Sequence, residues 1–132
     1  MTTSTTMNHK TVLLFDDDIN ILEVCTIILE ECGYKVAISE TSHDIIEKVT
    51  EIQPDVILMD NWIPEIGGVK ATQLLKQHPD FKHIPVIYVS ANSDIHLLAQ
   101  QAGADTYLEK PFNLDDLENI VEQVLANAES NK

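Results

Sequence analysis

Residues 56–60 read Val-Ile-Leu-Met-Asp, a run of four apolar residues that ends on a carboxylate. A short apolar run of this kind is typical of a strand that is buried on both faces of a sheet. Similar short runs lie along the chain in both directions, at Thr11–Phe15, Val36–Ile38, Val86–Val89 and Thr106–Leu108. The sequence therefore predicts five strands, and the third of them carries Asp60 at its end.

The stretches between these runs have apolar residues spaced by three and four, which predicts helices with one buried face. The clearest stripe consists of Leu117, Ile120, Val121, Val124 and Leu125. Before it, Asn113 and Asp116 have the spacing of a reciprocal helix cap, and Asp18 is expected to cap the first helix. Ser93 or Asn92 could cap the fourth helix. Five strands that alternate with five helices predict an α/β fold, with a parallel sheet covered on both faces.

The composition fits one domain and restricts its partners. The chain has 132 residues, 44% of them hydrophobic, and its 22 acidic and 8 basic residues give a net charge of −14. This length is usual for a single domain with one core. A surface this negative repels phosphate backbones, so we expect no direct binding to nucleic acid. Divalent cations and basic protein patches are the favoured partners.

We expect a cytoplasmic protein with a short disordered start. Residues 1–9 are rich in Thr and lack the apolar core of a secretory signal, and no apolar run approaches the about 20 residues that span a membrane. Cys25 and Cys32 are too far apart in one predicted helix for a disulfide, so both are expected to be reduced. We predict a disordered segment at 1–9, a domain at 10–127 and a polar tail at 128–132.

Polar side chains follow four of the predicted strands. Asp16 and Asp17 come directly after the first strand, Asp60 ends the third, Ser90 ends the fourth, and Lys110 follows the fifth. Because the carboxyl ends of parallel strands form the binding crevice of such a sheet, we expect these side chains to share one edge. Ionised carboxylates at close range repel one another unless a cation joins them, and oxygen ligands suit Mg²⁺.

These residues allow phosphoryl chemistry. A carboxylate can attack phosphorus and form an aspartyl phosphate, while Mg²⁺, an ammonium and a hydroxyl neutralise the phosphoryl oxygens. Asp60 is the better candidate for the nucleophile because it ends the central buried run. A solvated turn is the competing interpretation of Asp16 and Asp17, and the presence of Asp60, Ser90 and Lys110 weakens it.

Four segments stand at the predicted strand ends: Phe15-Asp16-Asp17-Asp18, Leu58-Met59-Asp60-Asn61-Trp62-Ile63-Pro64, Val89-Ser90-Ala91 and Tyr107-Leu108-Glu109-Lys110-Pro111-Phe112. In this order they resemble the receiver domains of two-component response regulators, and the resemblance covers residues 10–126. It implies a flavodoxin-like (βα)5 fold, which is a doubly wound parallel sheet of five strands in the order 2-1-3-4-5. It also implies a cis bond between Lys110 and Pro111.

The resemblance assigns a role to each residue at the strand ends. It implies that Asp60 is the phosphorylated residue and that Lys110 pairs with the phosphoryl oxygens. Asp17 would bind Mg²⁺ directly and Asp16 mostly through water, together with Asp60. The backbone carbonyl of Trp62 would be the remaining protein ligand.

Other residues are implied to act on switching and on the phosphoryl lifetime. Ser90 would be the switch hydroxyl, and Tyr107 would be the aromatic that turns inward on activation. Tyr107 could instead be an ordinary half-buried strand aromatic. Trp62 and Asn92 stand where the family tunes the lifetime of the phosphoryl group. We expect the bulky Trp62 side chain to shield the acyl phosphate, although simple packing is a second interpretation.

The resemblance implies a single-domain response regulator that is phosphorylated by a histidine kinase or a phosphotransfer protein. Phosphorylation would switch a face that binds a downstream target protein. Such a chain catalyses its own phosphorylation and dephosphorylation and is not a turnover enzyme. A receiver domain from a larger regulator or hybrid kinase, or an interaction module that is not phosphorylated, are the alternatives. A phosphatase is disfavoured because its second Asp would stand where this chain has Trp62.

Overall fold

The computed structural model describes residues 9–130, in which five strands alternate with five helices. In chain order the elements are β1 (Thr11–Phe15), α2 (Ile19–Glu31), β2 (Lys35–Ser39), α3 (Ile45–Ile52), β3 (Val56–Asp60), α4 (Gly67–Gln77), β4 (Val86–Ser90), α5 (Ile95–Ala102), β5 (Thr106–Glu109) and α6 (Leu114–Ser130). All five predicted strands are present. The disorder predicted for residues 1–8 lies outside the described residues.

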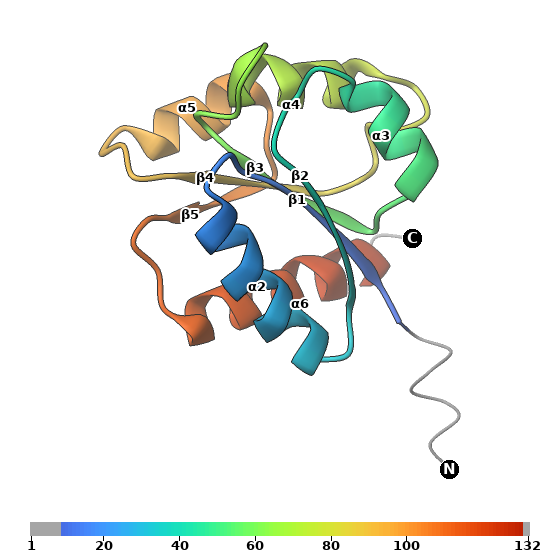
Figure 1. Ribbon diagram of the computed structural model, residues 1–132. Helices are drawn as coiled ribbons and strands as arrows, with labels where there is room; N and C mark the ends of the chain where they lie inside the picture. The colour runs from blue at the N-terminus through green and yellow to red at the C-terminus, as the bar shows by residue number, and fades with distance from the viewer. Residues whose placement is uncertain (1–8, 131–132) are drawn as a thin grey trace.

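The strands form one parallel sheet in the order β2-β1-β3-β4-β5, as the flavodoxin-like prediction required. Helices α2 and α6 cover one face, and α3, α4 and α5 cover the other (Figure 1). Side chains alternate between the faces along each strand. Leu58 therefore packs in the core below α2 and α6, whereas Met59 packs in the core below α3 and α4. Asp60 comes directly after this pair, at the edge where the two layers meet.

Two of the predicted helix caps, at α2 and α6, are present in the structure. The Asp18 carboxylate accepts hydrogen bonds from the amides of Asn20 and Ile21 at 3.0 and 3.4 Å, as predicted. At the start of α6, Asn113 accepts from the amide of Asp116 at 2.8 Å, and Asp116 accepts in return from the amide of Asn113 at 3.4 Å. This reciprocal cap is also confirmed.

Neither of the two residues predicted to cap the fourth helix, α5, is its N-cap. Its N-cap residue is Asp94, whose side chain makes no capping bond. Asn92 instead accepts a hydrogen bond from the Asp94 amide at 2.7 Å, so it closes the turn before the helix. The prediction that Ser93 caps α5 was wrong, because the helix begins two residues later, at Ile95.

The last helix is longer than its apolar stripe suggested. It continues to Ser130, so residues 128–130, predicted to be part of a polar tail, belong to α6. Alanine at 126 and 128 favours continued helix even where no apolar stripe remains. Both cysteines are free thiols, as predicted. Within residues 9–130, no helix combines the length and the apolar character that crossing a membrane requires.

Candidate metal centre at the strand ends

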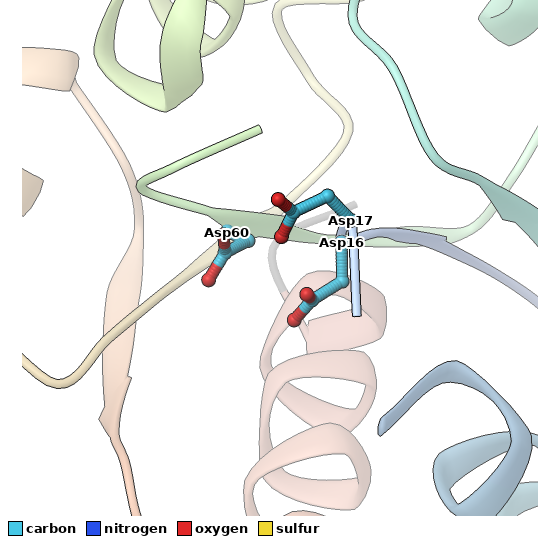
Figure 2. A group of neighbouring side chains, drawn as sticks. All are labelled: Asp16, Asp17 and Asp60. Atoms are coloured by element: carbon cyan, nitrogen blue, oxygen red, sulfur yellow. The ribbon is translucent and has the colours of Figure 1, made fainter. Parts of the chain in front are cut away.

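Three carboxylates meet where β1 and β3 end, because these strands are neighbours in the sheet. Asp16 follows β1 and is 5% exposed, Asp60 ends β3 and is 3% exposed, and Asp17 is exposed to solvent. Each offers one oxygen, and these oxygens all lie within 4.8 Å of one another. Figure 2 shows the three side chains grouped at the ends of the two strands. The predicted convergence of Asp16, Asp17 and Asp60 is therefore present.

Lys110 reaches the same group from the end of β5, which lies two strands away from β3 in the sheet. Its amide donates to the carbonyl oxygen of Ser90 at 2.9 Å, which continues the pairing of β4 and β5 past the end of β5. Its Nζ lies 3.0 Å from Asp16 Oδ2 and 2.9 Å from Asp60 Oδ1. The bond to Pro111 is cis, as the resemblance implied.

The site is electrostatically unbalanced despite this lysine. Burial raises the pKa of Asp60, and the nearby charge of Asp16 raises it further. The hydrogen bonds from Lys110 and from the Trp62 amide lower it without cancelling the rise. Burial lowers the pKa of Lys110, but the hydrogen bonds and charges of Asp60 and Asp16 outweigh burial, so its pKa is raised. The Lys110 ammonium is therefore held charged. A further cation nearby would stabilise the ionised form of Asp60 and lower its pKa.

The donor set fits a hard divalent cation. Within residues 9–130 the group that could hold a metal consists of Asp16, Asp17 and Asp60, and it offers oxygen alone. Oxygen ligands, two of them buried, match the preference of Mg²⁺ for a few carboxylates and retained waters. A cation there would also relieve the repulsion between the carboxylates. The exposed position of Asp17 leaves one side of the group open to solvent.

Ser90 ends β4 at the edge of the sheet where Asp60 lies, and Tyr107 lies within β5; neither side chain hydrogen-bonds to Asp60. Ser90 is buried, and its Oγ accepts a hydrogen bond from the amide of Asn92 at 3.0 Å. Tyr107 is 39% exposed, and its ring meets that of His96 edge-on with the centroids 5.8 Å apart. Tyr107 therefore faces the surface between α5 and β5.

The loop after β3 approaches the carboxylates closely. The Trp62 amide donates to Asp60 Oδ2 at 3.0 Å, whereas the side chain of Trp62 is 72% exposed. Helix α4 begins directly against the end of β3, and Gly68 makes this possible. A Cβ at Gly68 would lie 2.5 Å from the carbonyl oxygen of Asp60, closer than any side chain could be accommodated against backbone.

Two residues near the site were missed in the sequence. Ser42 is fully buried and bonds to the loop after β3 through its hydroxyl. Tyr88 is fully buried in β4, and its hydroxyl donates to Asn61 Oδ1. The sequence offers a signal for Tyr88 only, because a polar-tipped residue inside the apolar run 86–89 needs a buried partner. Ser42 looks like any other loop residue.

Comparison with known proteins agrees with the fold. The family model described as the response regulator receiver domain matches residues 12–122. The chain is 33% identical to the transcriptional regulatory protein CreB of Escherichia coli over 110 residues, which make up 81% of this chain and 47% of CreB. It is 28% identical over 122 residues to the polar-differentiation response regulator DivK of Brucella ovis, covering 90% of this chain and 98% of DivK.

A solved structure shows the same likeness in three dimensions. The response regulator receiver domain protein (CheY-like) of Methanospirillum hungatei has a TM-score of 0.84 and 28% identity, over 95% of this chain and 100% of that one. The chain thus spans about half of CreB and nearly all of DivK. Because the family match covers most of the chain, this protein belongs to the family of response regulator receiver domains.

Proposed function

We propose that this chain accepts a phosphoryl group on Asp60 from a histidine kinase or a phosphotransfer protein, in a reaction that depends on Mg²⁺ and takes place in the cytoplasm. Asp16, Asp17, Asp60 and the Trp62 carbonyl are the proposed metal ligands. Lys110 and Ser90 are the proposed partners of the phosphoryl oxygens. The observation that carries the proposal is the meeting of Asp16, Asp17 and Asp60 with the Lys110 ammonium.

The reaction follows from this arrangement. An Asp60 oxygen attacks the phosphorus and forms a P–O bond while the P–N bond to the donor histidine breaks, and the electron pair returns to the imidazole nitrogen. Lys110 lies within hydrogen-bonding distance of Asp60, so its ammonium can follow the phosphoryl oxygens as their charge grows. When bound, Mg²⁺ supplies positive charge to the same oxygens. Attack of water on the same phosphorus breaks the P–O bond to Asp60 and releases phosphate, so the chain catalyses its own modification and its reversal without being a turnover enzyme.

Phosphorylation is proposed to change the face formed by α5, β5 and α6, where a downstream target protein would bind. Ser90 ends β4 beside Asp60, and Tyr107 lies exposed on β5. A phosphoryl group that draws the Ser90 hydroxyl away from the Asn92 amide frees the loop before α5. Space then opens for the Tyr107 ring to turn inward. The proposed site chemistry is the same whether the chain acts alone or within a larger regulator.

The decisive experiment uses acetyl phosphate or phosphoramidate as the donor, with and without Mg²⁺, and intact-mass measurement of the product. One phosphoryl group should be gained in the presence of Mg²⁺ and lost again on removal of the donor. Asp60→Asn should gain none, whereas Asp80→Asn, a change in an exposed loop residue, should behave as the parent does. Modification of Asp60→Asn, or none of the parent with Mg²⁺ present, contradicts the proposal and favours a module that is not phosphorylated.

Trp62 and Asn92 are proposed to set the lifetime of the phosphoryl group. The Trp62 amide donates to Asp60 Oδ2, and the indole of the same residue is largely exposed to solvent. The loss of phosphate from the parent and from Trp62→Asn can be compared by following mass over time after the donor is removed. A shorter lifetime in the variant supports shielding. An unchanged lifetime contradicts it and leaves packing as the role of the indole.

A further inference from the structure

The loop between β3 and α4, residues 61–66, is held on one side by a buried serine. Ser42 lies in the turn after β2, and its hydroxyl donates to the carbonyl oxygen of Pro64 at 2.7 Å. The same hydroxyl accepts from the amide of Ile66 at 3.1 Å, and the Ser42 amide donates to the Pro64 carbonyl at 3.1 Å. Ser42 is fully buried, so water has little access to its side of these three bonds.

The other end of the loop is held by a buried tyrosine. Tyr88 lies in the middle of β4, and its hydroxyl donates to the side-chain oxygen of Asn61, the first residue after Asp60. The Asn61 backbone is fixed as well, with its amide on the Val89 carbonyl at 2.9 Å and its carbonyl accepting from Gly68 at 3.1 Å. Burial raises the pKa of Tyr88 to about 12, so the hydroxyl keeps the proton that it donates.

The loop would not hold this shape on its own residues. Glu65 has φ of 85° and Gly67 has φ of 80°. A non-glycine residue adopts the left-handed region only at a cost, so surrounding contacts must maintain it. Along the loop, Trp62 lies between the residues that Tyr88 and Ser42 hold. Its amide donates to Asp60, and its carbonyl is a proposed metal ligand. The position of that carbonyl therefore depends on the contacts at both ends.

We propose that Ser42 and Tyr88 are positioning residues that set the affinity of the site for Mg²⁺ by fixing the loop that carries Trp62. The proposal rests on the metal site proposed above. Mg²⁺ demands near-ideal octahedral geometry, so a ligand that moves weakens binding. Residues that orient metal ligands without touching the metal typically change metal affinity by 10- to 100-fold when they are replaced. Neither hydroxyl has a role in phosphoryl transfer itself.

The test is a Mg²⁺ titration of four proteins, followed by the fluorescence of Trp62, the single tryptophan of the chain. The proteins are the parent, Ser42→Ala, Tyr88→Phe and Thr50→Ala. Each variant loses one hydroxyl, and Thr50 is the matched control because its hydroxyl bonds to the Ile46 carbonyl inside α3, away from the loop. We expect Mg²⁺ to bind about tenfold more weakly to Ser42→Ala and Tyr88→Phe. The affinity of Thr50→Ala should equal that of the parent.

Hydrogen exchange of the metal-free proteins gives a second readout that does not depend on Mg²⁺ or on the tryptophan. The amide of Ile66 should exchange faster in Ser42→Ala, since its acceptor is gone, while the Ile57 amide inside β3 keeps its rate. Parent-like Mg²⁺ affinity in both variants overturns the inference, even if urea denaturation shows that they are less stable. If the parent itself gives no response to Mg²⁺, the proposed metal site fails and this inference fails with it.

Discussion

Replacing Asp60 by Asn should make the metal-free protein more stable at pH 7, although it removes the residue on which the proposed reaction depends. Asp60 lies with Asp16 and Asp17 in a group whose oxygens are within 4.8 Å of one another. With that upper limit as the separation, repulsion from Asp16 is worth at least about 3.5 kcal/mol at an effective dielectric constant near 20. Repulsion from the solvated Asp17 is worth about 1 kcal/mol at the dielectric constant of water. Attraction to Lys110 Nζ, 2.9 Å from Oδ1, is worth about 6 kcal/mol on the same scale.

These charge interactions nearly cancel, so the cost of burying a carboxylate decides the sign. That cost is several kcal/mol for an ion that is almost fully buried, as Asp60 is at 3% exposure. An amide avoids it and can still accept a hydrogen bond from Lys110. We expect Asp60→Asn to raise the free energy of unfolding by about 1–3 kcal/mol. This direction agrees with the raised pKa of Asp60.

The pH dependence of the stability difference tests the same prediction independently. Because the pKa of Asp60 is raised in the folded state, that state binds its proton more tightly than the unfolded state does. The stability that this proton provides is complete below the ordinary carboxyl pKa of about 4 and is lost as the pH rises through the raised value. The advantage of Asp60→Asn over the parent should therefore grow from pH 4 to pH 7.

Urea unfolding followed by far-ultraviolet circular dichroism measures this difference in the presence of a chelator. Glu51→Gln removes one negative charge from an exposed position on α3 and controls for the change in net charge. Adding Mg²⁺ should raise the urea midpoint of the parent much more than that of Asp60→Asn, since only the parent keeps all three carboxylates. If Asp60→Asn is less stable than the parent at pH 7 without metal, the ion pair with Lys110 outweighs burial and the reasoning is wrong.

Three further predictions concern stability. Gly68→Ala should lower the free energy of unfolding by about 2–3 kcal/mol, because its Cβ would meet the Asp60 carbonyl oxygen at 2.5 Å. Gly67→Ala, with open space but a left-handed φ, should cost only about 1 kcal/mol, and equal costs would contradict the steric explanation. Lys110→Met should lower the urea midpoint of the metal-free protein, because it removes the cation that pairs with Asp16 and Asp60. Mg²⁺ should restore the midpoint, and a midpoint that does not respond to Mg²⁺ would argue against repulsion between the carboxylates. Asp18→Ala should cost about 1 kcal/mol through loss of the α2 cap, and an unchanged thermal midpoint would refute that assignment.

The parts of the fold that were predictable from the sequence depend on local pattern. Apolar runs located every strand, and the shared edge of a parallel sheet brought Asp16, Asp17, Asp60 and Lys110 together. The strand ends were less predictable. The second strand runs from Lys35 to Ser39 and not from 36 to 38, because ladder hydrogen bonds form regardless of whether the end side chains are apolar.

The remaining parts of the site depend on contacts between distant segments. Ser42 meets Pro64 and Ile66 only because the turn after β2 packs against the loop after β3. No periodicity records such a contact, since both segments are irregular. The same holds for the orientation of Tyr107, which depends on its contact with His96 on α5. Sequence pattern thus predicted which groups share the edge of the sheet, but not what holds each of them in place.

The hydrogen bonds of Asp60 bear on how its carboxylate is prepared for the proposed transfer before any donor arrives. Lys110 donates to one of its oxygens and the Trp62 amide donates to the other, which orients the carboxylate and leaves each oxygen a further lone pair. A phosphoryl donor that approaches this carboxylate would meet an oriented nucleophile, and the Lys110 ammonium is the partner that can move with the incoming charge. The idle state thus already holds the carboxylate in a fixed direction, so little rearrangement would have to precede the proposed attack.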